Sequence, residues 1–143
     1  MRTLALVIGL LGATNAWADE PRDLLAQAKA FERAGQWQEA RDAYGKLEAV
    51  DGWRGVGFYG EGWSAFQQGD FAAAANLAAK AIAAPHSRRD EARALYGDAL
   101  FKLHEYERAR NVYVVTERSA PAAMKVMLQK KIAACDRMLQ KSS

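Results

Sequence analysis

The sequence predicts an all-α fold, a solenoid of three helical hairpins followed by a C-terminal capping helix. Two observations support this prediction. A pattern of aromatic and small residues recurs about every 34 residues, and turn-forming residues interrupt the helical periodicity at matching intervals. Residues 19–143 show no strand-like alternation of apolar and polar positions. One unit alone is too small to bury its apolar face, so stacked units and a cap are expected to share a continuous core.

The repeat is visible in three segments: AGQWQEARDAY (34–44), QGDFAAAANLA (68–78) and LHEYERARNVY (103–113). Their aromatic residues Trp37, Phe71 and Tyr106 lie 34 and 35 residues apart. Small residues keep the same spacing, at Ala28, Gly62 and Gly97 upstream and at Ala40, Ala74 and Ala109 downstream. Two helices of a hairpin approach to about 8–10 Å, so these positions are predicted to be close contacts between helices.

Each unit is predicted to form two short helices joined by a tight turn. The expected helices are about 22–34 and 37–50, 55–68 and 71–84, and 90–103 and 106–119, followed by a last helix at 121–141. The turns within units contain Gly35, Gly69 and His104, and the breaks between units contain Gly52, Pro85 and Pro121. Glycine and proline end helices at such points for backbone reasons.

The pattern resembles the tetratricopeptide repeat family, whose 34-residue units carry W-x-x-L-G-x-x-Y, then A-x-x-x-F, then P. The first unit matches at Leu24, Ala28, Phe31, Ala40 and Tyr44, and the third at Tyr96, Gly97, Leu100, Ala109, Tyr113 and Pro121. The resemblance implies a right-handed α-solenoid with repeats at about 21–54, 55–88 and 90–123 and a capping helix at about 121–141. It also implies a protein-binding function.

The first 18 residues have the layout of a secretory signal peptide. Arg2 is followed by the apolar run 4–13 and by Ala16-Trp17-Ala18, a small-x-small cleavage signal. The run is shorter than the roughly 20 residues of a transmembrane helix, although an uncleaved anchor is the alternative. Residues 19–143 are therefore expected to form one exported domain, periplasmic in a bacterium, with no membrane span after cleavage.

The charge distribution argues against nucleic-acid binding, and the single cysteine excludes an internal disulfide. The net charge is +3, and basic residues are interspersed with acidic ones, so the chain lacks the basic patch of a nucleic-acid binder. Cys135 is the one cysteine, and it shares an apolar helical face with Leu128, Ile132 and Leu139. We expect it to be a buried packing residue, with an intermolecular disulfide as the alternative.

The segment GVGFYG (55–60) fits the dinucleotide-binding pattern G-x-G-x-x-G, but its context does not. A helix precedes it instead of a strand, Gly60 falls inside a helix, and Lys80 stands where an acid is required. We expect Gly55 and Gly57 to loosen the start of this helix. Gly60 has no evident role, although glycine there costs about 1 kcal/mol relative to alanine.

No catalytic or metal-binding set is predicted. His86 and His104 are the only histidines, and neither has ligands at suitable spacing. We therefore predict a non-enzymatic protein without cofactors.

The candidate partner site is an aromatic stripe on the first helix of the middle unit: Tyr59, Trp63 and Phe66. In the family, this face lines a concave groove that binds extended peptides or partner helices. The same register adds Lys29 and Arg33 from the first unit and Asp98, Phe101 and Lys102 from the third. Aromatic clusters surrounded by polar groups concentrate binding energy. Alternatively, the capping helix folds over the stripe and makes it core.

The predicted function is a non-enzymatic scaffold that binds a peptide or partner protein in this groove. In the periplasm it would serve an envelope assembly, secretion or cell-wall complex, which rests on analogy with the family. The alternative is a self-assembling structural subunit, a homodimer formed through the groove or the first repeat.

Overall fold

The computed structural model describes residues 20–143, and these residues form seven α-helices and no strands. The helices are α1 (Pro21–Arg33), α2 (Trp37–Leu47), α3 (Arg54–Gln67), α4 (Phe71–Ala83), α5 (Arg89–Lys102), α6 (Tyr106–Ser119) and α7 (Ala122–Lys141). The predicted all-α class is confirmed. The signal peptide predicted for residues 1–18 lies outside the described residues.

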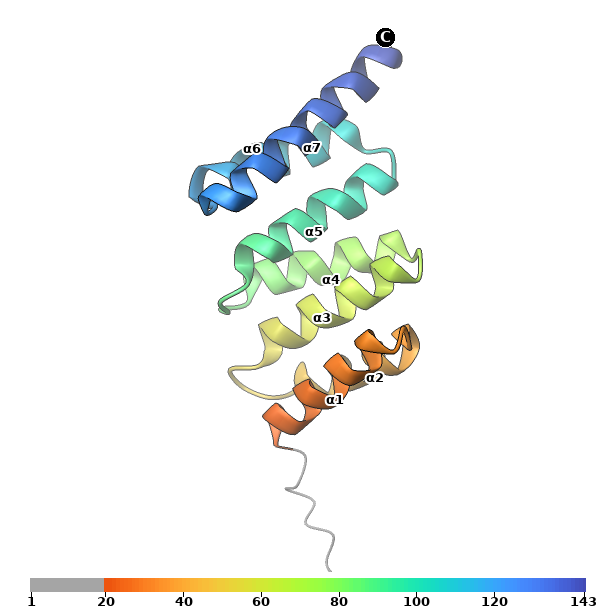
Figure 1. The fold of residues 1–143 in the computed structure, drawn as a ribbon, viewed down its shortest axis with the longest axis vertical. Coiled ribbons are helices and arrows are strands. Elements are labelled where there is room, and N and C mark those ends of the chain that lie inside the picture. Colours follow the sequence, from red (N-terminus) through yellow and green to blue (C-terminus); the bar gives the residue numbers. More distant parts are fainter. Residues whose placement is uncertain (1–19) are drawn as a thin grey trace, which may run out of the picture.

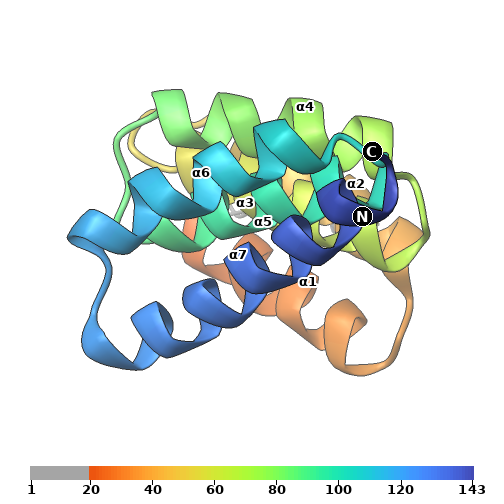
Figure 2. The same cartoon turned by 90° about the horizontal axis from the view of Figure 1, so that it is seen from above.

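Each helix packs mainly on the next one along the chain. The helices are stacked in chain order along the long axis of the molecule, from α1 at one end to α7 at the other (Figure 1). Viewed along that axis, α1 and α7 project toward the same side, with α3 and α5 set back between them and α4 and α6 behind (Figure 2). The described part is therefore a helical solenoid whose α1, α3, α5 and α7 side is concave.

The turn inside each hairpin has the same backbone geometry. Gly35, Gly69 and His104 adopt left-handed conformations, with φ of 71°, 80° and 64°. In each case the next N–H donates to a carbonyl five residues back, from Gln36 to Phe31, from Asp70 to Ala65 and from Glu105 to Leu100, all at 2.9 Å. This is the left-handed helix end that glycine favours, and the third turn forms it with histidine. The repeat seen in the sequence is thus also a repeat of backbone structure.

One predicted helix end is wrong. Helix α2 ends at Leu47 instead of residue 50, and the chain then turns tightly through Gly52, whose φ is 80°. The Val50 N–H bonds to the Leu47 carbonyl and the Trp53 N–H to the Val50 carbonyl, at 3.1 and 3.0 Å. These short-range bonds replace the helical ones after Leu47. The predicted end was three residues too late because the apolar spacing continues through the turn.

The glycines of α3 are sites of close approach. A Cβ on Gly60 would lie 2.2 Å from Cε1 of Tyr44, and one on Gly57 would lie 2.8 Å from the Tyr44 carbonyl oxygen. The expectation that Gly55 and Gly57 loosen the start of this helix is wrong, because α3 begins at Arg54 and a Cβ on Gly55 would meet the His86 ring at 2.6 Å. Glycine lets α2 pack directly on the α3 backbone, which explains Gly60.

The C-terminal end of the solenoid has the largest apolar core. Tyr113, Leu128 and Cys135 are almost or completely inaccessible to solvent, and they join α5, α6 and α7. Cys135 is a buried packing residue, as predicted. Helix α7 covers α6 with this face, so the C-terminal helix does pack as a cap on the last hairpin.

Candidate interaction surface

The aromatic stripe of α3 lies at the centre of the concave side. The Trp63 side chain is 37% exposed, and its ring stacks on Phe66 with centroids 6.2 Å apart and an interplanar angle of 7°. Phe66 is half-buried and meets Phe71 of α4 edge-on, with centroids 5.1 Å apart. Trp63 is therefore anchored to the core through Phe66 while part of its own ring faces solvent.

A hollow of about 320 Å³, here called the C-terminal hollow, lies beside this stripe. Its walls come from α3, α5, α6 and α7, and they consist of Phe66, Asp98, Phe101, Lys102, Tyr113, Lys131 and Ala134. This volume lies at the lower end of the range of about 300–1,000 Å³ for small-molecule pockets and has room for one or two side chains.

A second hollow of about 420 Å³, the N-terminal hollow, separates α1 from α3. Leu25, Lys29, Val56 and Tyr59 are among its lining residues, together with Arg88 from the loop before α5. The Arg88 guanidinium lies 4.6 Å from the centroid of the Tyr59 ring, a cation–π contact. Burial raises the pKa of the Tyr59 hydroxyl even though Arg88 opposes the shift, so this tyrosine stays neutral.

The structure places six of the eight predicted site residues in these two hollows. Phe66, Asp98, Phe101 and Lys102 share the C-terminal hollow, and Lys29 and Tyr59 line the N-terminal one. Trp63 lies between them along α3 and lines neither, and Arg33 is exposed in the last turn of α1. The capping helix packs on α6 and leaves Trp63 partly exposed.

Sequence reasoning missed the residues that α7 and the α4–α5 loop contribute. Lys131 and Ala134 form one wall of the C-terminal hollow, and Arg88 covers Tyr59. Helix α7 has no second helix after it, so the hairpin register assigned it no concave face. Its cluster of lysines was the available signal, but periodicity alone did not show that Lys131 points toward α5.

Polar contacts hold the C-terminal hollow in shape. Asp98 of α5 accepts hydrogen bonds from the Tyr113 hydroxyl and the Lys131 ammonium, so it ties α5 to α6 and α7. Burial raises the pKa of the Tyr113 hydroxyl, and the neighbouring Asp98 carboxylate raises it further. This tyrosine remains a hydrogen-bond donor, and the Asp98 carboxylate has two partners.

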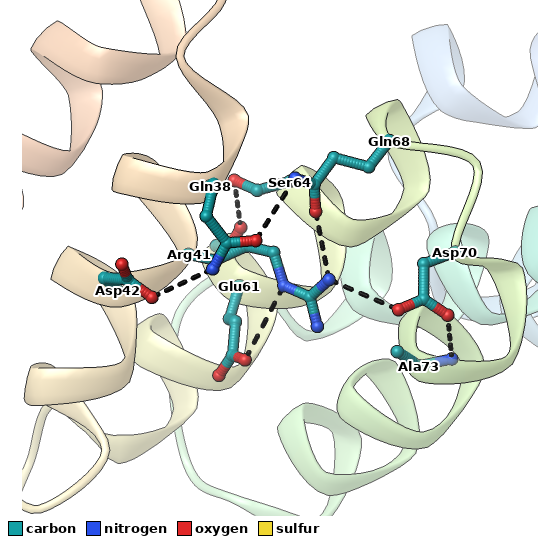
Figure 3. A network of polar contacts seen from close by, with 9 residues as sticks. Gln38, Arg41, Asp42, Glu61, Ser64, Gln68, Asp70 and Ala73 are labelled. Carbon is teal, nitrogen blue, oxygen red and sulfur yellow. Dashed lines mark hydrogen bonds and ion pairs between the residues drawn. The ribbon is translucent and has the colours of Figure 1, made fainter.

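A polar network positions the first hairpin relative to the second (Figure 3). Arg41 of α2 donates to Gln68 at 2.9 Å and to Asp70 at 3.2 Å, and its Nε lies 3.9 Å from Glu61 (Figure 3). Asp70 in turn accepts from the Ala73 N–H at the start of α4, at 3.2 Å. One side chain of α2 therefore contacts α3 and the residue that caps the start of α4.

Two carboxyl groups meet in the same joint. Burial, together with the neighbouring carboxyl group of Glu61 and its charge, raises the pKa of Glu48 to about 8. Oε1 of Glu48 is buried and has no hydrogen-bond partner among residues 20–143. The raised pKa predicts that the two carboxyl groups share one proton near neutral pH. Glu48 also borders a wider hollow of about 870 Å³, half of whose lining residues are glycine or alanine.

Residues 65–130 match the family described as tetratricopeptide repeat. None of the curated proteins compared with the chain matches it. The match and the all-helical solenoid together support a tetratricopeptide repeat protein, and such repeats are scaffolds for protein–protein interaction. None of the helices formed by residues 20–143 is both long and apolar enough to cross a bilayer.

Proposed function

We propose that the chain binds an extended segment of another protein on its concave face, and that it does so in the periplasm without catalysing a reaction. The observation that carries this proposal is the exposed Trp63 ring, stacked on Phe66 between two hollows. An aromatic side chain held by the core but open to solvent is characteristic of the residues that dominate binding interfaces. The separate hollows suit alternate side chains of one extended segment.

Trp63→Ala tests the site. We expect it to weaken partner binding while the free energy of unfolding falls by about 1–2 kcal/mol, less than the ~3–5 kcal/mol of a fully buried tryptophan. Val115→Ala, at an exposed position on α6 away from the concave face, is the matched control. Binding is measured by photo-crosslinking from a reactive amino acid at position 101, in the C-terminal hollow, in intact cells that carry the otherwise wild-type, Trp63→Ala or Val115→Ala chain, followed by mass spectrometry. Equal yields of the same adducts from all three chains would argue against a concave binding site.

The proposed location rests on the sequence of residues 1–18. If these are a signal peptide, the purified native protein begins at Asp19, which intact mass spectrometry measures directly. A mass that includes residues 1–18, together with fractionation into the cytoplasm, would contradict export. The interaction scaffold itself would not be affected by that result.

Self-association is the competing outcome at the same surface. Size-exclusion chromatography with light scattering distinguishes it from partner binding, because the proposal expects a monomer. A stable homodimer that Trp63→Ala dissociates would show that a second copy occupies the face.

A further inference from the structure

The acidic groups of the concave face are already engaged within the protein. Asp98 accepts from Lys131 and Tyr113, and Glu91 pairs with Arg88 at 3.5 Å. Burial raises the pKa of the Glu32 carboxyl group of α1, and the nearby charges of Arg88, Lys29 and Arg33 oppose that shift. These carboxylates therefore present little free negative charge to a ligand.

Three cations of α1 and α5 form no ion pair within the described part of the chain. Among residues 20–143, no carboxylate oxygen lies within ion-pairing distance of Lys29, Arg33 or Lys102. Lys29 lines the N-terminal hollow and Lys102 the C-terminal one. The Lys102 ammonium lies 5.8 Å from the Phe71 ring centroid, so its stem follows the aromatic cluster while its charge remains available. Uncompensated charge on this face is thus positive at both hollows.

The apolar component of the face is at its centre. Phe66 and Phe101 wall the C-terminal hollow, and Trp63 extends the aromatic surface along α3 toward the N-terminal one. A ligand that follows the face therefore meets a cation, an aromatic centre and a second cation in turn. Complementary charge selects partners and speeds association, and apolar contact supplies the affinity.

We propose that the partner segment is an acidic peptide with a bulky apolar residue, which fills the C-terminal hollow while flanking carboxylates pair with Lys102 and with Lys29 or Arg33. This inference rests on the proposed function and adds the chemical class of its ligand. Basic segments are disfavoured because they meet free positive charge at each end of the face. Nucleic acid is also anionic but does not supply the aliphatic or aromatic side chain that the hollow accommodates.

The experiment is selection from a displayed library of random dodecapeptides on the full exported chain, in parallel with Trp63→Ala. We expect recovered peptides to be enriched in Asp and Glu around Phe, Trp or Leu, and the enrichment to be lost on Trp63→Ala. A recovered peptide, labelled with fluorescein, then gives a dissociation constant by anisotropy, with a labelled oligothymidine as competitor. Enriched peptides that are neutral or basic, or displacement by the oligothymidine at equal concentration, would overturn the inference.

Charge reversal tests the named contacts. Lys102→Glu is expected to lower the affinity of the protein for the recovered peptide at least about fivefold. The affinity of the wild-type protein is expected to fall when the salt concentration rises from about 0.05 to 0.5 M. Lys46→Glu is the matched control, because Lys46 is also an exposed lysine in the last turn of its helix, α2. Equal effects of the two reversals would contradict the inference. If peptides bind through Trp63 but their affinity does not depend on charge, the acidic ligand is refuted and the proposed function is not. A library that yields no peptide refutes both the acidic ligand and the proposed function.

Discussion

The two ends of the solenoid are joined by different physical means. Between α2 and α3 the contact is polar and tight, with the Arg41 network, the Glu48–Glu61 pair and the Tyr44 ring on Gly60. Between α6 and α7 the contact is a filled apolar core around Leu128 and Cys135. The matched family segment, 65–130, includes α6 and the part of α7 that carries Leu128, but not Cys135, and it begins near the end of α3. Within one stack of helices, the stability of the α2–α3 joint therefore depends on protonation and on close backbone contact. The stability of the α6–α7 joint depends on how well apolar side chains fill its core.

The largest effect is expected in the apolar joint. Leu128→Ala removes a completely buried side chain, and we expect the free energy of unfolding to fall by about 2–5 kcal/mol in urea denaturation. Val126→Ala, on the same helix but 56% exposed, is the control and should change stability by less than about 0.5 kcal/mol. Similar losses for both variants would mean that α7 is not held by its buried face.

The joint between α2 and α3 is expected to be destabilised by any side chain added at Gly60. Gly60→Ala places a Cβ 2.2 Å from the Tyr44 ring, so it should destabilise by about 1–3 kcal/mol even though alanine favours helix. Gly45→Ala in α2 is the matched test, because its Cβ would meet only Glu61 Oε2, at 3.9 Å. That variant should be more stable by up to about 1 kcal/mol. A stabilising Gly60→Ala would show that Tyr44 can move away freely.

The polar joint should weaken between pH 7 and 9, whereas the apolar joint, in which burial raises the pKa of the Cys135 thiol above its ordinary value of 9.0, should respond mainly above that range. The pKa of Glu48 is about 8 in the folded chain, mainly through burial, against 4.5 for an ordinary glutamate. Between these values the folded state keeps a proton that the unfolded state has released, so stability falls as pH rises and levels off above about 8. The lowered pKa of His86 acts mainly below its ordinary value of 6.5 and the raised pKa of Cys135 mainly above its ordinary value of 9.0, so the carboxyl pair governs most of the change between pH 7 and 9.

Glu48→Gln provides the comparison for this pH dependence. Glutamine keeps a donor for Glu61 but does not titrate, so the variant's melting midpoint should change less than that of the wild type between pH 7 and 9. A wild-type midpoint that is flat over this range, or a variant that follows it, would contradict the shared proton. Differential scanning calorimetry in matched buffers measures both.

The smallest effect is expected for the Arg41 network. Arg41→Ala should cost about 0.5–1.5 kcal/mol, because the lost hydrogen bonds are partly exposed, and the cost should shrink in 0.5 M salt. Lys46→Ala on the same helix, which has no ion pair among residues 20–143, is expected to change stability by less than about 0.5 kcal/mol. The Leu128→Ala loss, by contrast, should not respond to screening in this way. If the loss in free energy of unfolding on Arg41→Ala does not change with salt, the α2–α3 joint is not stabilised electrostatically by Arg41.

The sequence by itself determined the helices, the turns and the positions where hairpin helices approach. Apolar spacing located α1 and α3, and Gly35 and Gly69 marked the turns that follow them, because these signals lie within a few residues of one another. Even the third turn was found without glycine, from the register alone, at His104. The aromatic stripe at Tyr59, Trp63 and Phe66 was equally visible, since helical spacing puts the three residues on one face.

Only the tertiary structure decided how one unit meets the next. Gly60 had no explanation until Tyr44, from the preceding hairpin, was seen to pack against it. The C-terminal hollow depends on where α7 places Lys131 and Ala134, and the pairing of Glu48 with Glu61 depends on how α2 crosses α3. Helical periodicity records which face of a helix is apolar. The angle and depth at which two such faces pack are set by all the side chains between them, and no local pattern contains that information.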